Sequence, residues 1–291
     1  MSHNTEAITV NSFTITTSDD FKLAATSYEP PAPIANIIIA GATGVPQDFY
    51  RRFSRFAAKN GYRTITFDYR GISKSKTQDL NGFKASFTDW ATLDLAAVVD
   101  EIVDDKSETF MVAHSFGGHA FGQLPNHQKI AGMYVFATGA GWRGWMPKYE
   151  SIRVNIMWNA ILPTLTFLKG YTPMSMLGMG EDLPFGVYQQ WRKWCKYPHY
   201  FFDDPKVSTA MKEKFSKVKV PIVAANAVDD SWATPRSRDA FIKGYKNADV
   251  TCKDILLSSS LPKVGHMGYF RPESKKLWID VLEWIAVNKK D

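Results

Sequence analysis

The chain has 291 residues, of which 45% are hydrophobic and 22% charged, and its formal net charge is +6. This composition is typical of a globular protein and excludes a disordered or collagen-like chain. The longest apolar stretch, residues 156–168, contains an asparagine and a proline and is shorter than the roughly 20 residues that a membrane span needs. Basic residues are scattered, and an acidic and two apolar residues interrupt the densest stretch, 212–219, so we expect a solvated helix end and no nucleic-acid partner.

The first ten residues lack both the basic and the apolar regions of a secretion signal, so we expect a cytoplasmic protein without stable membrane insertion. Cys195 and Cys252 have no metal-ligand spacing, and we expect two free thiols.

The predicted strands come in two kinds. Residues 7–28 alternate apolar and polar side chains around Ser18–Asp20, which predicts an antiparallel hairpin with one wet face. Short continuous runs of β-branched and other strand-forming residues follow, and such runs indicate strands buried on both faces of a parallel sheet. They are Ile34–Ala40, Tyr62–Phe67, Phe110–Ala113, Met133–Ala137 and Val220–Ala225, with a last strand at Val250–Leu257.

Helical patterns alternate with these strands, which predicts an α/β fold with right-handed crossovers. We expect helices at Gln47–Asn60, Thr88–Asp105, Phe116–Leu124 and Glu273–Asn288. One segment, residues 142–216, has no strand-like run and is rich in tryptophan, so we expect a helical cap inserted into a core of residues 1–141 and 217–291.

The candidate nucleophile is Ser115. It follows the predicted strand Phe110–Ala113 and precedes two glycines, which matches the nucleophile elbow G-x-S-x-G with Ala113 in the first position. The elbow brings neighbouring chain close, so its flanking residues must be small. The structural alternative is a serine that only caps the next helix.

A serine hydroxyl needs a base, and the base needs an orienting acid. His266 is the candidate base, because it lies between glycines after the last predicted strand. The other histidines lie in the N-terminal tail, at the elbow, on or after the following helix, or in the insertion: His3, His114, His119, His127 and His199.

The acid is expected after a strand that follows the elbow, in the chain order Ser, Asp, His. Asp229 and Asp230 both follow the predicted strand Val220–Ala225, and the spacing leaves either as the acid. The other would then cap the helix that begins near Pro235.

Over nearly its whole length the chain resembles the α/β-hydrolase superfamily, and within it a group of mostly bacterial predicted hydrolases. The resemblance rests on the elbow and on the motifs at Gly41–Val45, Phe67–Gly71 and Gly265–Arg271. It implies a triad of Ser115, His266 and Asp230, because Asp230 has the family's distance from the proline that opens its strand. Three small residues depart from the family pattern: Ala40, Ser73 and Ala113.

An oxyanion hole requires two backbone N–H groups, one from the residue after the nucleophile and one from the loop after the third strand. These would be Phe116 and Ala42, with Thr43 as the alternative if the loop is shifted by one residue. The same loop lacks G-x-G-x-x-G, so no dinucleotide site is expected, and no motif implies a metal or other cofactor.

We therefore expect a serine hydrolase that cleaves an acyl bond, with a carboxylic ester of an apolar small molecule as substrate. Trp191 and Trp194 are spaced to share one side of a cap helix and are candidate pocket residues; the alternative is a lid with a packed aromatic core. Two alternative functions keep the same triad: an acyltransferase, and a ligand-binding or receptor protein of low turnover.

Overall fold

The computed structural model describes residues 7–104 and 107–290 and contains one eight-stranded sheet. The strand order is β1-β2-β4-β3-β5-β6-β7-β8. The hairpin β1–β2 is antiparallel, β2 pairs antiparallel with β4, and all other pairs are parallel. The strands are β1 (Thr9–Thr16), β2 (Lys22–Glu29), β3 (Ala35–Ala40), β4 (Tyr62–Phe67), β5 (Thr109–His114), β6 (Gly132–Phe136), β7 (Ile222–Ala227) and β8 (Val250–Ile255).

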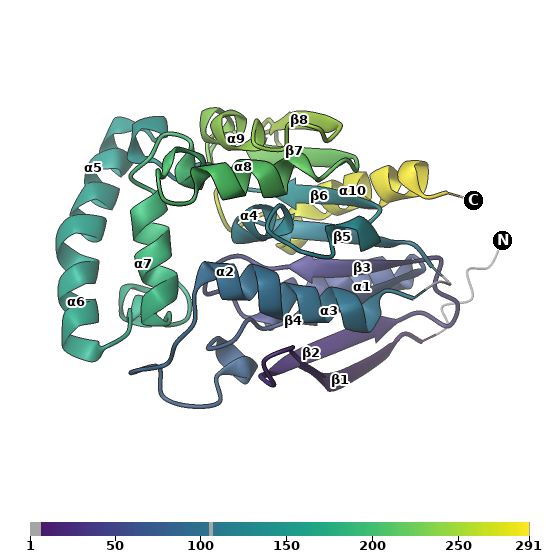
Figure 1. Cartoon of the computed structure of the whole chain (residues 1–291). Helices are drawn as coiled ribbons and strands as arrows, with labels where there is room; N and C mark the ends of the chain where they lie inside the picture. The colour runs from purple at the N-terminus through teal and green to yellow at the C-terminus, as the bar shows by residue number, and fades with distance from the viewer. Residues whose placement is uncertain (1–6, 105–106, 291) are drawn as a thin grey trace.

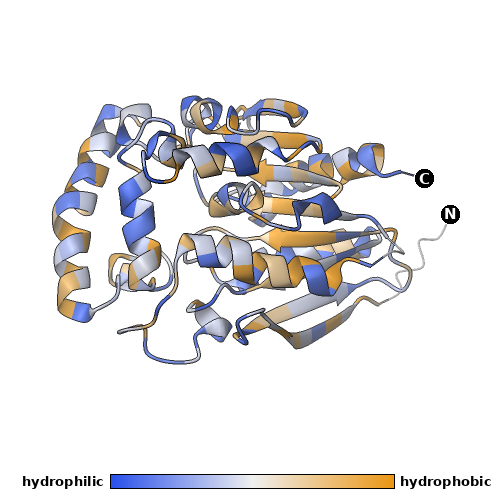
Figure 2. Ribbon diagram, in the orientation of Figure 1, coloured by the Kyte–Doolittle hydropathy of each residue, from blue (hydrophilic) through white to orange (hydrophobic). Residues whose placement is uncertain are grey.

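The α/β class, the antiparallel hairpin and the mostly parallel sheet that the sequence predicts are confirmed. Every residue of β3, β5, β6 and β7 is buried, whereas β1 exposes most of its side chains at the sheet edge. Figure 2 shows the hydrophobic colour concentrated in the central strands. Residues 1–6, which include His3, and Asp105, the last residue of a predicted helix, lie outside the described residues.

Helices cover both faces of the sheet (Figure 1). One face carries α1 and α10, whose apolar side chains share a core with β3, β5 and β7. The other face carries the remaining core helices. The core helices are α1 (Arg51–Lys59), α2 (Phe87–Asp89), α3 (Leu95–Ile102), α4 (Phe116–Phe121), α8 (Ser208–Ser216), α9 (Pro235–Ile242) and α10 (Lys275–Asn288).

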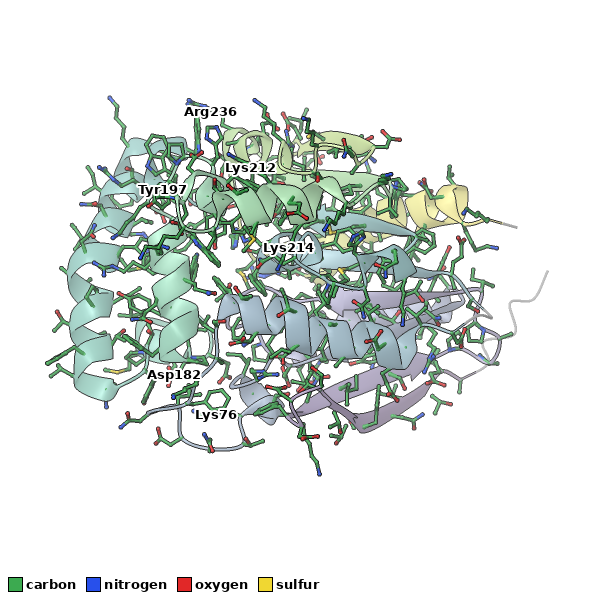
Figure 3. All side chains as sticks on the ribbon, viewed as in Figure 1. Lys76, Asp182, Tyr197, Lys212, Lys214 and Arg236 are labelled. Atoms are coloured by element: carbon green, nitrogen blue, oxygen red, sulfur yellow. The ribbon has the colours of Figure 1, made fainter. Side chains whose placement is uncertain are left out.

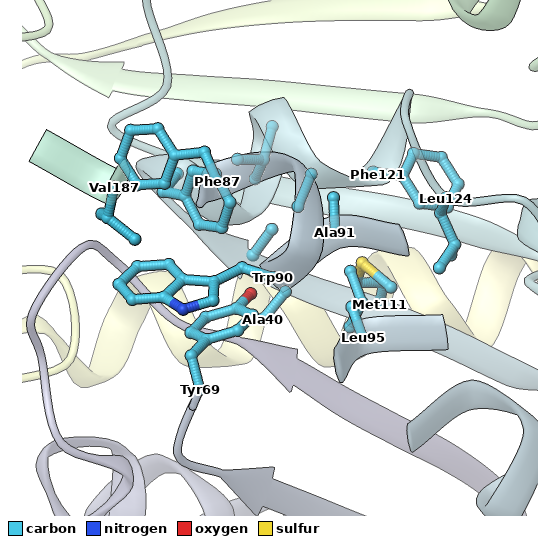
Figure 4. Packing of buried hydrophobic residues seen from close by; sticks show 14 of the residues in the cluster. Ala40, Tyr69, Phe87, Trp90, Ala91, Leu95, Met111, Phe121, Leu124 and Val187 are labelled. Atoms are coloured by element: carbon cyan, nitrogen blue, oxygen red, sulfur yellow. The ribbon is translucent and has the colours of Figure 1, made fainter. Parts of the chain in front are cut away.

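The helix predicted at Thr88–Asp105 is divided, because a π-helical turn at Trp90–Asp94 separates α2 from α3. The first turn is fixed by a capping box, in which the Ser86 side chain accepts from the Asp89 amide and the Asp89 carboxylate accepts from the Ser86 amide. Trp90 is fully buried and stacks on Tyr69 with the ring centroids 4.9 Å apart (Figure 4). This packing anchors the helix beside the elbow.

Three helices of residues 142–216 stand beyond the end of the sheet, at the left of Figure 1: α5 (Lys148–Ile156), α6 (Leu162–Lys169) and α7 (Phe185–Trp194). A π-helical turn joins α5 to α6. In contrast, α8 packs on the core, where Phe215 contacts the rings of Phe241 and Tyr245. Across residues 7–104 and 107–290, no helix combines the length and apolarity needed to cross a bilayer.

The basic stretch at residues 212–219 includes the end of α8, where Lys212 and Lys214 are labelled in Figure 3. Lys212 is exposed, whereas Phe215 and Val218 are buried. The stretch is therefore a solvated helix end, as the interrupted charge pattern predicts.

Candidate active site

Ser115 occupies a sharp turn between β5 and α4. Its φ of +52° and ψ of −106° are unfavourable for a residue with a Cβ, so the surrounding packing must maintain this backbone. A Cβ on Gly117 would lie 2.2 Å from the carbonyl oxygen of Ala40, and one on Gly118 would lie 2.6 Å from Oγ1 of Thr138. The small residues that the sequence places after the serine are therefore required by close chain contacts.

His266 connects Ser115 to Asp230 through hydrogen bonds. Nε2 of His266 lies 3.1 Å from Oγ of Ser115, and Nδ1 lies 2.9 Å and 3.2 Å from the two carboxylate oxygens of Asp230. The three residues follow β5, β7 and β8, whose carboxyl ends meet at one edge of the sheet. The fold thus brings together the three side chains that the sequence singled out.

The Asp230 carboxylate is buried at 1% exposure and held by several donors. The amides of Trp232 and Ala233 each donate to it over 2.9 Å, and the Tyr269 hydroxyl donates over 3.3 Å. Burial raises the pKa of Asp230, but the charge of His266, its hydrogen bond and the two amides together hold that pKa below its usual value.

The pKa of His266 is shifted in the opposite direction. Burial disfavours its protonated form, but the charge of Asp230 and their hydrogen bond outweigh burial, so the pKa of His266 lies above its usual value. The pair therefore favours an imidazole that can accept a proton from the serine.

Asp229 does not cap the helix that begins near Pro235, which is the role predicted for the aspartate outside the triad. Its two carboxylate oxygens each accept an amide hydrogen over 2.9 Å, from Val264 and Gly265, which immediately precede His266. Thr234 is the N-cap of α9 instead, because its hydroxyl oxygen accepts a hydrogen bond from the amide of Ser237. The prediction that the second aspartate caps α9 was wrong. Strand β8, which precedes the loop of His266, pairs with β7, so this loop lies within reach of Asp229. The positions of the two aspartates in the sequence do not reveal this pairing.

The Ala42 amide, expected to be an oxyanion donor, donates to the Tyr50 hydroxyl over 2.8 Å. The amides of Thr43 and Phe116, in contrast, have no acceptor within the described part of the chain. The free donors beside Ser115 are therefore those of Phe116 and of Thr43, the alternative loop residue.

Sequence reasoning missed a buried link between this loop and the histidine loop. The Tyr50 hydroxyl lies 3.0 Å from Nδ1 of His114, and Nε2 of His114 lies 2.9 Å from the backbone oxygen of His266. Burial, with the nearby charge of His266, lowers the pKa of His114 to about 3, so its ring is neutral at pH 7. Because Tyr50 accepts from Ala42 and donates to Nδ1, the His114 proton resides on Nε2 and points to the carbonyl.

A cavity of about 300 Å³ opens beside Ser115, between the end of the sheet and the helices α5 and α7. Its wall is mostly apolar, with methionine and tryptophan side chains. It is lined by Ala42, Thr43, Val45, Ser115, Arg153, Met174, Gly178, Met179, Gly180, Trp191, Trp232, His266 and Met267.

The two candidate pocket tryptophans have different environments. Trp191 lines the cavity and packs edge-on against Trp158, with the ring centroids 4.9 Å apart. Trp194 does not line the cavity; it is 2% exposed, and its indole N–H donates to Asp204 over 3.2 Å. Residues three apart on a helix differ by about 60° in direction, which is enough to place one in the cavity and the other in the core.

Comparison with known proteins places this fold in a family. The model of the Alpha/beta hydrolase family matches residues 37–274, most of the chain, and the chain belongs to this family. No curated protein matches the sequence.

Similar solved structures include enzymes. A soluble variant of the Saccharomyces cerevisiae monoglyceride lipase has a TM-score of 0.69 at 14% identity, covering 100% of this chain and 99% of its own. A Pyrococcus furiosus esterase has a TM-score of 0.63 at 16% identity, covering 96% and 91%. A protein described as degrading N-acyl homoserine lactones has a TM-score of 0.61 at 17% identity, covering 94% and 99%. At these identities the likeness establishes the shared fold.

Proposed function

We propose that this protein is a serine hydrolase that cleaves a carboxylic ester of an apolar small molecule through an acyl-enzyme. The observation that carries the proposal is the continuous hydrogen-bonded chain from Ser115 through His266 to Asp230. Membership of the Alpha/beta hydrolase family supports a hydrolase, and the esterase and lipase among the similar structures support an ester.

In the proposed reaction, Oγ of Ser115 attacks the ester carbonyl while Nε2 of His266 takes the hydroxyl proton. Asp230 holds Nδ1–H and stabilises the imidazolium that forms. The proton then passes to the leaving alkoxide, which departs as the alcohol. Water, deprotonated by the same imidazole, hydrolyses the acyl-enzyme and restores Ser115.

The negative charge on the carbonyl oxygen requires two donors in this reaction. We assign them to the amides of Phe116 and Thr43, because the Ala42 amide already donates a hydrogen bond to the Tyr50 hydroxyl. The apolar wall of the adjoining cavity, which includes Trp191, suits a hydrocarbon group of the ester.

The test is turnover of 4-nitrophenyl esters by the wild type and by Ser115→Ala, with Ser12→Ala on the exposed strand β1 as the control. Triad knockouts reduce turnover by roughly 10⁴-fold or more, and we expect this for Ser115→Ala alone. A fluorophosphonate should label Ser115 in the wild type. Near-normal turnover by Ser115→Ala, or labelling at another serine, would overturn the proposal.

The same assay separates the two alternative functions. Repeated turnover in water supports a hydrolase. Turnover only with an added alcohol or amine acceptor would identify an acyltransferase instead. Release of one equivalent of nitrophenol, followed by no further turnover, would identify a low-turnover binding protein.

A further inference from the structure

One charged side chain stands out in the cavity beside Ser115. Among the described residues that line this cavity, Arg153 is the only arginine, lysine, aspartate or glutamate. It projects from α5 of the cap, and about half of its side chain is exposed to solvent. The cavity thus combines a mostly apolar wall with a single permanent positive charge that solvent can reach.

A buried acid fixes the orientation of this guanidinium. Nε and Nη2 of Arg153 donate to the two carboxylate oxygens of Glu150 over 3.0 Å and 2.6 Å. Glu150 is itself held in place, because the indole N–H of Trp232 donates to it over 2.5 Å and its side chain is 9% exposed. Trp232 lies two residues after Asp230 in the same loop, and its amide donates to the Asp230 carboxylate, so the orientation of Arg153 is tied to the site.

The contact with Glu150 leaves part of the guanidinium unused. Arginine has five N–H donors, and Glu150 engages one on Nε and one on Nη2. No acceptor for Nη1 of Arg153 occurs among the residues that the structure describes. The edge formed by Nη1 and Nη2 therefore remains available to a planar, doubly oxygenated anion, for which the arginine fork is suited.

We propose that Arg153 binds a carboxylate at the end of the substrate remote from the ester carbonyl, while the apolar wall binds the chain between them. The substrate class is then a monoester of an apolar dicarboxylic acid, or an ester that carries a carboxylate of similar reach. This inference rests on the proposed hydrolase function and adds charge selectivity to it. It narrows the proposed apolar ester to one that also carries a remote carboxylate.

The size of the effect follows from the exposure of Arg153. An exposed ion pair contributes little, and Glu150 already offsets part of the positive charge. A bidentate contact with a carboxylate contributes more than a single one. We expect roughly a five- to tenfold preference in kcat/KM at low ionic strength, decreasing in 0.5 M salt because solvent ions screen the pair.

The experiment compares two isosteric series of 4-nitrophenyl esters made from acids with six to ten carbons, which are too long to release nitrophenol by rapid closure to a cyclic anhydride. One series ends in a free carboxylate and the other in a primary carboxamide, so the two differ in charge and hardly in shape. The wild type should prefer the carboxylate at one or more chain lengths. Arg153→Gln should lose this preference, with kcat/KM decreasing more for the carboxylate series than for the carboxamide series, and Arg153→Lys should retain part of the preference.

Lys148→Gln is the matched control, because Lys148 is an exposed cation on the same helix outside the cavity. It should retain the wild-type preference, and melting temperatures should show that all variants fold. A wild type without carboxylate preference at any length, an Arg153→Gln variant that keeps it, or equal loss in Lys148→Gln would overturn the proposal. Absence of Ser115-dependent turnover of both series would instead refute the hydrolase function itself.

Discussion

The two adjacent acids provide the sharpest test of the site, because the structure assigns them different partners. Asp230 contacts the imidazole of His266, whereas Asp229 contacts the amides of Val264 and Gly265 on the same loop. Replacing each by asparagine keeps the shape and removes the charge. We therefore expect Asp230→Asn to affect mainly turnover and Asp229→Asn to affect mainly stability.

The magnitudes follow from these contacts. Asparagine at 229 keeps one acceptor oxygen but turns an NH₂ group toward the second amide, so about one charge-assisted hydrogen bond is lost, or roughly 2 kcal/mol. For a chain of 291 residues we expect Tm to decrease by about 3 °C. Asparagine at 230 favours the wrong tautomer of His266, and triads with this change lose about 10⁴-fold in kcat.

The pH profile separates the two variants further. Because the charge of Asp230 raises the pKa of His266, its removal should lower that pKa. Neutral imidazole is the active form, so the residual activity of Asp230→Asn should persist to lower pH than that of the wild type. Asp229→Asn should retain the wild-type acid limb, because its carboxylate does not contact the ring.

The measurements are kcat and kcat/KM against pH and thermal unfolding, with Asp249→Asn on the surface as the control. The reverse ranking, with Asp229→Asn losing most of the turnover and Asp230→Asn little, would reassign the acid. Equal mild effects on turnover would show that neither aspartate orients His266.

Further changes test the packing around the site. Gly117→Ala should reduce the yield of folded protein, measured by expression and Tm, because its Cβ would lie 2.2 Å from a backbone oxygen; normal stability would refute the close contact. Trp194→Ala should lower stability by about 3–5 kcal/mol in denaturant titrations, as expected for a buried aromatic. Trp191→Ala should instead weaken the dependence of kcat/KM on acyl chain length, about 0.8 kcal/mol per buried methylene, and an unchanged dependence would remove Trp191 from the pocket. Tyr50→Phe should lower stability by about 1 kcal/mol, seen in the same titrations, because the Ala42 amide and the His114 ring lose their shared partner; an unaltered stability would show that this link is not needed.

The sequence by itself determined the sheet and the position of the nucleophile. Parallel strands that are buried on both faces are rich in apolar side chains, so runs such as Phe110–Ala113 indicate strands locally. The elbow is also recognised locally, because Ser115 and the two glycines that the close contacts with Ala40 and Thr138 require lie within four positions of the chain. Local patterns of this kind need no knowledge of the neighbouring chain.

Only the tertiary structure decided how the surrounding groups are used. Asp229 and Asp230 are adjacent, and their different partners depend on a loop more than thirty residues later. The occupation of the Ala42 amide depends on the direction of the Tyr50 side chain after the intervening turn. Arg153 belongs to a helix whose sequence shows no motif, and its place beside Ser115 depends on how α5 is positioned relative to the end of the sheet. A hydrogen bond between two distant segments forms only when the fold brings both segments together. Hydrophobic periodicity predicts the helices and strands but does not predict which segments meet.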